Sequence, residues 1–142
     1  MNYRSATNYL NNYINFEVNP ATAYAPEKFN LDRVHNLLKR IGSPHLQYPS
    51  VHIAGTKGKG SVASMTESVI RSSNHVTGLF TSPHLHDLRE RIRVNGKIIS
   101  KKSFVDLLVD LQSAIESTAD ITYYEIMTIL AMEYFARQKV DI

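Results

Sequence analysis

The chain has 142 residues, enough for one compact domain with a hydrophobic core. Hydrophobic residues make up 43% and charged residues 20%, a balance typical of a soluble globular protein, and the net charge of +3 suits an anionic ligand without requiring nucleic acid. The absence of cysteine excludes disulfides and thiolate metal sites. Because we see neither a signal peptide nor an apolar run long enough to span a membrane, we expect a cytoplasmic protein with no membrane partner.

The first half of the chain contains two helical patterns and then a short apolar stretch. Asn30 is a candidate N-cap for the second helix, and Gly42 is its expected stop. In chain order, the predicted elements are a helix over 6–15, a loop over 16–30, a helix over 31–41, a connector over 43–50, a strand over 51–54 and a helix from Ser61.

The second half contains one hairpin signal and two long helical patterns. Asn95-Gly96 supplies the positive φ angles of a type I′ turn. The last helix is apolar on most sides, so we expect it to be buried. The predicted elements are a strand over 76–80, a loop over 81–90, a hairpin over 91–99, helices over 104–115 and 122–138, and the opening of a strand over 139–142.

This order of elements predicts an α/β fold with a doubly wound sheet in three layers. In such sheets, ligands bind at the carboxyl ends of the strands, which is where the glycine-rich stretch stands. We find no internal repeat, no low-complexity segment and no second domain.

The stretch HIAGTKGKGS, residues 52–61, is the main candidate for a ligand site. It departs from the usual G-x-x-x-x-G-K-[ST] spacing, because Ile53 stands where the first glycine should be. A strand before it and a helix after it nevertheless favour phosphate binding over a mobile surface turn with Ser61 as an ordinary N-cap. The candidate phosphate-binding residues are Gly55, Thr56, Lys57, Gly58, Lys59, Gly60 and Ser61.

Four motifs in order, HIAGTKGKGS, FTSPHL, RERIRVNG and TYYE, resemble the N-terminal part of the folylpolyglutamate synthase/dihydrofolate synthase family, a branch of the Mur ligase superfamily. The resemblance implies a P-loop sheet of the Mur ligase central-domain type, incomplete at the C-terminus, with residues 1–142 as the N-terminal part of the ATP-binding ligase domain. The C-terminal domain and further Mg²⁺ ligands of the family lie beyond Ile142. We therefore expect the chain alone to be inactive.

The resemblance also implies a reaction and its cofactors. ATP and Mg²⁺ would be used to add L-glutamate to a folate or to dihydropteroate through an acyl phosphate. Lys59 would be the catalytic cation on the phosphates, and Ser82 a Mg²⁺ ligand. The implied substrate-binding residues are Pro83, His84, Thr122, Tyr123, Tyr124 and Glu125, with a weaker match at Asn30 and Leu31.

Several of these residues have plainer structural interpretations. Thr122 and Glu125 have the spacing of a helix capping box, and Ser82-Pro83 is also a common turn. His84 and His86 form an H-x-H pair, but without a third ligand nearby we do not predict a transition-metal site.

A basic cluster surrounds the predicted hairpin. It is either a solvated face or a contact for an anionic polyglutamyl tail, and no aromatic residues are interleaved with it as a nucleic-acid platform. Its members are Arg89, Arg91, Arg93, Lys97, Lys101 and Lys102.

Two alternatives remain open at this point: a small-molecule kinase and a non-catalytic nucleotide-binding module. For the ligase, we expect the whole enzyme to be a monomer. We expect the chain alone to associate with a second copy through uncovered apolar surface on the 122–138 helix.

Overall fold

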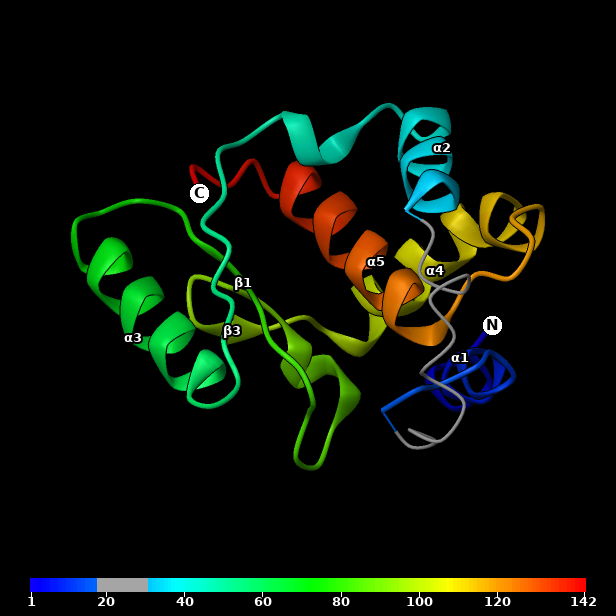
Figure 1. The fold of residues 1–142 in the computed structure, drawn as a ribbon, viewed down its shortest axis with the longest axis horizontal. Helices are drawn as coiled ribbons and strands as arrows, with labels where there is room; N and C mark the ends of the chain where they lie inside the picture. The colour runs from blue at the N-terminus through cyan, green and yellow to red at the C-terminus, as the bar shows by residue number, and fades with distance from the viewer. Residues whose placement is uncertain (18–30) are drawn as a thin grey trace.

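The computed structural model describes residues 1–17 and 31–142, and Figure 1 shows their arrangement. Helices and strands occur in one chain, so the predicted α/β class is confirmed. The helices are α1 Tyr3–Asn11, α2 Asp32–Arg40, α3 Lys59–Ser72, α4 Lys101–Glu116 and α5 Tyr123–Arg137, with 3-10 helices η3 Pro44–Leu46 and η4 Leu88–Arg91. The strands are β1 Gly78–Phe80, β2 Ile92–Val94 and β3 Lys97–Ile98.

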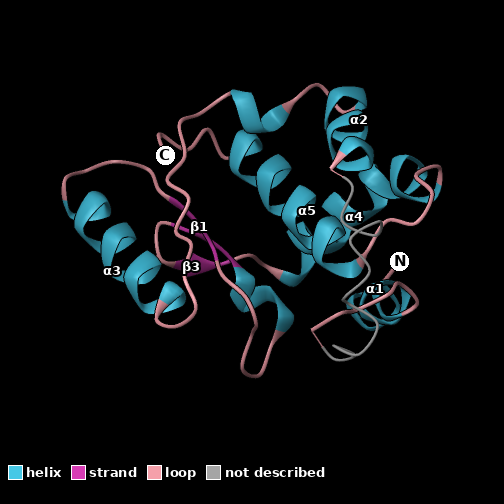
Figure 2. Cartoon of the chain, viewed as in Figure 1, coloured by secondary structure: helices cyan, strands magenta, loops and turns pink. Residues whose placement is uncertain are grey.

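Helix α5 forms the centre of the hydrophobic core. Ile126, Met127, Ile129 and Leu130 are fully buried, which confirms the prediction from its all-round apolar sequence. In Figure 2, α5 lies beside α4 and α2, while the small sheet separates this helical half from α3. The sequence predicts uncovered apolar surface on the 122–138 helix, but most apolar side chains of α5 are buried. Exposed apolar side chains lie instead on α3, and association with a second copy stays a prediction.

The two N-terminal helices differ from their predicted bounds because of how they begin. Helix α1 begins at Tyr3, earlier than predicted, because Asn2 and Ser5 form a capping box. Helix α2 has Leu31 as its N-cap without a side-chain hydrogen bond, so the prediction of Asn30 as the cap is wrong. Asn30 itself lies outside the described residues. Gly42, with φ +89°, follows the end of α2 as predicted.

The described sheet is antiparallel, with the order β1-β2-β3. Asn95 and Gly96 both have positive φ, 50° and 72°, between β2 and β3, so the predicted hairpin is confirmed. Strand β1 pairs with β2, and Leu79 lies opposite Arg93.

Two predicted strands are absent from the described residues. No backbone–backbone hydrogen bond joins residues 51–54 to another described segment, as a strand would require. Residues 139–142 form no strand, although Asp141 N donates to Val76 O (2.7 Å) and Gly78 N donates to Ile142 O (2.8 Å). Both strand predictions are therefore wrong as stated, and the three-layer sheet is not confirmed.

Helix α1 is tied to η4 by a polar cluster around Asp87. The Tyr3 hydroxyl donates to Asp87 Oδ1 (2.7 Å), and Arg89 Nη2 contacts Asp87 Oδ2 at 2.6 Å. Hydrogen bonds from Arg89 hold the pKa of the Asp87 carboxyl well below its usual range. Burial raises the pKa of Tyr3 to about 12.

We expect Asp87→Asn to flatten the acid side of the stability profile. A carboxyl with a lowered folded-state pKa stabilises the fold above its unfolded pKa, and this contribution is lost as the pH falls below about 4. Urea unfolding of the chain across acidic pH measures the slope. Asp106→Asn is the matched control, because its ion pair with Lys102 is exposed and should contribute little. Equal slopes for wild type and Asp87→Asn would contradict the prediction.

Candidate functional site

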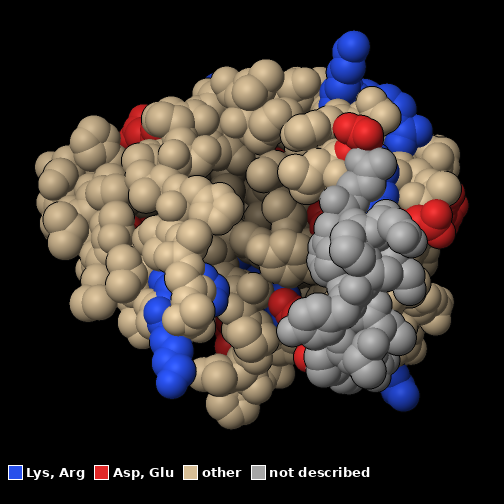
Figure 3. All heavy atoms as spheres, viewed as in Figure 1, with Lys and Arg blue, Asp and Glu red and all other residues tan. Residues whose placement is uncertain are grey.

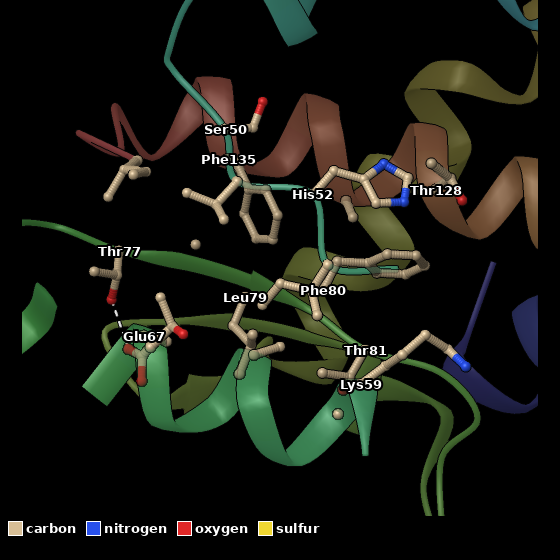
Figure 4. Close-up of a pocket in the computed structure, with 18 of the residues that line it drawn as sticks. Ser50, His52, Lys59, Glu67, Thr77, Leu79, Phe80, Thr81, Thr128 and Phe135 are labelled. Atoms are coloured by element: carbon tan, nitrogen blue, oxygen red, sulfur yellow. Dashed lines mark hydrogen bonds between the residues drawn. The ribbon is translucent and has the colours of Figure 1, made fainter. Parts of the chain in front are cut away.

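A cavity of about 670 Å³ lies between the glycine-rich stretch, β1 and α5. Figure 3 shows this hollow near the middle of one face, bordered mainly by uncharged residues. Its walls are residues 50–55, one face of α3 along most of its length, residues 77–82 and one face of α5. Figure 4 shows His52, Lys59, Thr81 and Thr128 among the side chains that line it.

The glycine-rich stretch leads directly into α3. Gly58 has φ +77° and is the N-cap of α3, without a side-chain cap. This left-handed conformation suits glycine, and it lets the helix begin at Lys59. The prediction that the helix begins at Ser61 is therefore wrong, and so is the alternative interpretation in which Ser61 is the N-cap. The first-turn amides of α3 and the helix dipole present a partial positive charge that suits an anion.

The two lysines of the stretch differ in their contacts. Lys59 folds back across the loop and its Nζ donates to the Gly55 carbonyl at 2.7 Å. Lys59 also lines the cavity, together with Gly55 and Gly60. Within the described part of the chain, no hydrogen bond or ion pair is found for Lys57. The structure thus favours Lys59 as the cation that meets a ligand in the cavity.

The end of β1 brings a second candidate group to the same cavity. Ser82 lines it, 23 residues after Lys59 in the chain, whereas Pro83 and His84 do not. His84 instead accepts a hydrogen bond at Nδ1 from Arg91 Nε (2.9 Å). Burial and the neighbouring Arg91 lower the pKa of His84.

The TYYE segment, residues 122–125, supplies both the N-terminal cap of α5 and one residue that lines the cavity. The Thr122 hydroxyl accepts from Glu125 N (3.3 Å), and Glu125 Oε2 accepts from Thr122 N (2.8 Å), so the capping box is confirmed. Glu125 also pairs with Arg33 of α2 at 2.9 Å. Tyr123 is buried, and only Tyr124 of the four lines the cavity. The ring of Tyr124 lies 6.0 Å from that of Phe80.

We expect Thr122→Ala to lower the free energy of unfolding by about 0.5–2 kcal/mol, because the amide of Glu125 loses its cap. Urea unfolding of the chain measures this loss. Thr7→Ala is the control, since the Thr7 hydroxyl donates only to a carbonyl within α1. Equal free energies of unfolding for the wild type and Thr122→Ala would contradict the capping role.

The residues of the predicted basic cluster do not act together, because several of them bind different acidic partners. Arg89 binds Asp87, and Lys102 contacts Asp106. Arg91 is only 1% exposed and pairs with Glu17, so the prediction that it offers a surface contact is wrong. Sequence reasoning missed this pair, because its members stand 74 positions apart and no pattern links them.

No family model matches this chain. The chain is 36% identical over 146 residues to the probable bifunctional folylpolyglutamate synthase/dihydropteroate synthase of Haloferax volcanii, covering 100% of this chain and 16% of that protein. The crystal structure of folylpolyglutamate synthase from Thermotoga maritima superposes with a TM-score of 0.85 at 32% identity, covering 99% of this chain and 31% of that chain. The structure of an FPGS–AMPPCP–folate complex superposes with a TM-score of 0.86 at 28% identity, covering 99% and 34% respectively.

The chain belongs to the folylpolyglutamate synthase/dihydrofolate synthase family. This confirms the resemblance seen in the four sequence motifs. The match extends over the whole chain but over only 16% to 34% of the three family members described.

Neither a metal-binding cluster nor a membrane-spanning helix is found in the described part of the chain. Among the described residues, no group of three or more histidine, aspartate or glutamate side chains is arranged to hold a metal ion. In the same residues, no helix combines the length and apolarity needed to cross a membrane.

Proposed function

We propose that this chain is the phosphate- and pterin-binding part of an ATP-dependent ligase that adds L-glutamate to a folate or to dihydropteroate. The observation that carries the proposal is that one cavity is lined by residues of three different segments, namely Gly55 and Lys59, Ser82, and Tyr124. A related structure that holds AMPPCP together with folate supports it. The cytoplasmic location expected from the sequence belongs to the same proposal.

In this reaction, a substrate carboxylate oxygen attacks the γ-phosphorus of ATP. The bond from that phosphorus to the β–γ bridging oxygen breaks, ADP leaves and an acyl phosphate forms. The amine of L-glutamate then attacks the acyl carbon. Phosphate leaves, and the nitrogen loses a proton to give the amide.

The residues of this chain would act mainly by position and charge. The Lys59 ammonium would leave the Gly55 carbonyl and neutralise phosphate oxygens. The amides of the first turn of α3, including Gly60 and Ser61, would hold those oxygens, together with the preceding loop residues Thr56, Lys57 and Gly58.

Mg²⁺ prefers oxygen ligands and often keeps phosphate oxygens and water among them. Ser82 supplies one hydroxyl oxygen at the cavity, so it fits as one ligand of a metal held chiefly by the phosphates of ATP. Bound Mg²⁺ would neutralise charge on the transferring phosphoryl group.

Tyr124 is the substrate-binding candidate best supported by the geometry. It is 45% exposed, lines the cavity and stands beside the ring of Phe80, so a planar pterin could stack against it. We propose that the pterin substrate is also bordered by Pro83, Thr122, Tyr123, Glu125 and Leu31. Asn30, the remaining candidate, lies outside the described residues.

We also propose that β1 and residues 141–142 are part of the doubly wound sheet expected from the sequence. The two backbone hydrogen bonds between residues 76–78 and 141–142 run in the direction of parallel pairing. Strand β1 contacts both α3 and α5, as expected for a sheet with helices on either side.

Product analysis with the full-length protein tests the proposed function. The protein is supplied with ATP, Mg²⁺ and L-glutamate, and with dihydropteroate or tetrahydrofolate in parallel reactions. We expect at least one substrate to gain a single glutamyl unit by mass, and the pair of results to show whether the enzyme has one or both activities. Formation of neither product would contradict the proposal.

A further inference from the structure

Glu67 is a buried acidic residue of α3 that has no part in the proposed reaction. Its side chain is 8% exposed, and it is the only buried residue of α3, a helix that the structure describes in full. The apolar side chains of Val62, Met65 and Val69 on the same helix are exposed. Burying a carboxylate is costly unless it is paired and hydrogen-bonded, so the partners of Glu67 show what holds α3 against the fold.

The carboxylate of Glu67 joins α3 to the residue that precedes β1. Its Oε1 accepts a hydrogen bond from the buried Thr77 hydroxyl at 2.6 Å, drawn as a dashed line in Figure 4. The same oxygen accepts from Arg71 Nε at 2.9 Å, within the helix. Among the described residues, no other side-chain hydrogen bond joins α3 to residues 76–82. This bond is therefore the polar link between the helix and β1.

The partners of Glu67 are themselves fixed by the hairpin turn. Thr77 N donates to Asn95 Oδ1 (3.0 Å), and Asn95 N donates to the Thr77 carbonyl (2.9 Å). The Arg71 guanidinium lies against Gly96, since a Cβ atom there would stand 3.3 Å from the guanidinium carbon. The hairpin thus holds both groups that contact the Glu67 carboxylate.

The Glu67–Thr77 bond lies at one end of two rigid arms. Along α3, Glu67 stands about 12 Å from Lys59, at 1.5 Å per residue. Along β1, the chain leads from Thr77 to Ser82. All four of these residues line the same cavity. Residues 73–76 connect the two arms but leave their angle free, so the side-chain bond is what sets it.

We propose that Glu67 is a positioning residue. Through its hydrogen bond to Thr77, it sets the N-terminus of α3 and Ser82 at the separation at which both contact one Mg²⁺–nucleotide complex. The proposal rests on the proposed function for the nucleotide and the metal. Glu67 itself touches neither of them, and its role is exerted through Thr77.

Binding of the ATP analogue AMPPCP to the full-length protein, in Mg²⁺ or in EDTA, tests this role. Without metal the phosphates need only α3, whereas with metal they need α3 and Ser82 together. Thr77→Val removes the donor and Glu67→Met the acceptor. Each should weaken binding by about threefold to tenfold in Mg²⁺, the value of one hydrogen bond, and by less than about twofold in EDTA. The double variant should bind no more weakly than either single variant, because both changes remove the same contact.

Matched variants separate this role from general damage to the helix. Thr77→Ser keeps the hydroxyl, so it should restore most of the binding in Mg²⁺. Glu133→Met should bind as the wild type does, since Glu133 also pairs with an arginine four residues later, is 15% exposed and does not line the cavity. Unchanged binding in Mg²⁺ by a folded Thr77→Val variant overturns the proposal. Equal weakening in Mg²⁺ and in EDTA also overturns it.

Amide hydrogen exchange of the full-length protein reports the link between α3 and β1 without any ligand. In Thr77→Val, the amides of α3 should exchange at least about threefold faster, while those of α5 keep their wild-type rates. Thr77→Ser should exchange as the wild type does. Unchanged exchange in α3 overturns the proposal. Absence of AMPPCP binding by the wild type would overturn the proposed function and the nucleotide role with it, whatever the exchange rates show of the link.

Discussion

Lys59→Ala is expected to abolish glutamate addition by the full-length enzyme, lowering kcat by at least about a hundredfold, because a preorganised charge on the transferring phosphoryl group is lost. ATP binding should weaken as well, since the ammonium makes a charge-assisted hydrogen bond to phosphate. The side chain already lies in the cavity, held by the Gly55 carbonyl at 2.7 Å. Steady-state kinetics and equilibrium binding of an ATP analogue measure the two effects.

Lys57→Ala is the matched control for this prediction. It removes the same charge two positions earlier in the same stretch, from a residue that does not line the cavity. We expect it to change kcat by less than about tenfold, because a surface charge acts on the site only through screened, longer-range interactions. Equal losses in Lys57→Ala and Lys59→Ala would show that the roles assigned to the two lysines are wrong.

Gly78→Ala is expected to destabilise the chain by about 1–3 kcal/mol, because it overpacks the contact between β1 and α5. A Cβ atom at Gly78 would lie 2.8 Å from the ring of Phe135. The ring is largely buried and packs edge-on against Tyr48 at 6.3 Å, so it must shift and lose part of this packing to accept the Cβ atom. The urea midpoint of the isolated chain measures the loss.

Gly60→Ala is the control for the glycine substitution. A Cβ atom at Gly60 meets nothing within 4 Å, and the residue lies in the first turn of α3. Alanine there should leave the stability unchanged or raise it by up to about 1 kcal/mol. The packing account of Gly78 would be contradicted by a Gly78→Ala variant as stable as Gly60→Ala.

The sequence predicts the elements whose signals are local. Helix α5 follows from an apolar pattern on nearly all sides and from the capping box of Thr122 and Glu125, and both features are present. The hairpin follows from Asn95-Gly96, because few other pairs accept two positive φ angles. The helix after the glycine-rich stretch also follows from a local signal, the helical spacing of its apolar residues.

The remaining features depend on contacts between distant parts of the chain. A strand at residues 51–54 requires a hydrogen-bonded neighbour, and the composition of VHIA carries no information about whether that neighbour is present. The start of α3 at Lys59 depends on the conformation of Gly58, which the sequence permits but does not require. The burial of Arg91 depends on Glu17, which no local pattern connects to it.

The most direct test of the proposed ligase is the dependence of ADP release on each substrate. The full-length protein is incubated with Mg-ATP and tetrahydrofolate or dihydropteroate, with and without L-glutamate, and ADP is measured against product. The account predicts sustained ADP release only when the pterin substrate and L-glutamate are both present, with one ADP for each glutamyl unit added. Sustained release with the pterin substrate alone, accompanied by a stable phosphorylated product, would identify a kinase and contradict the account.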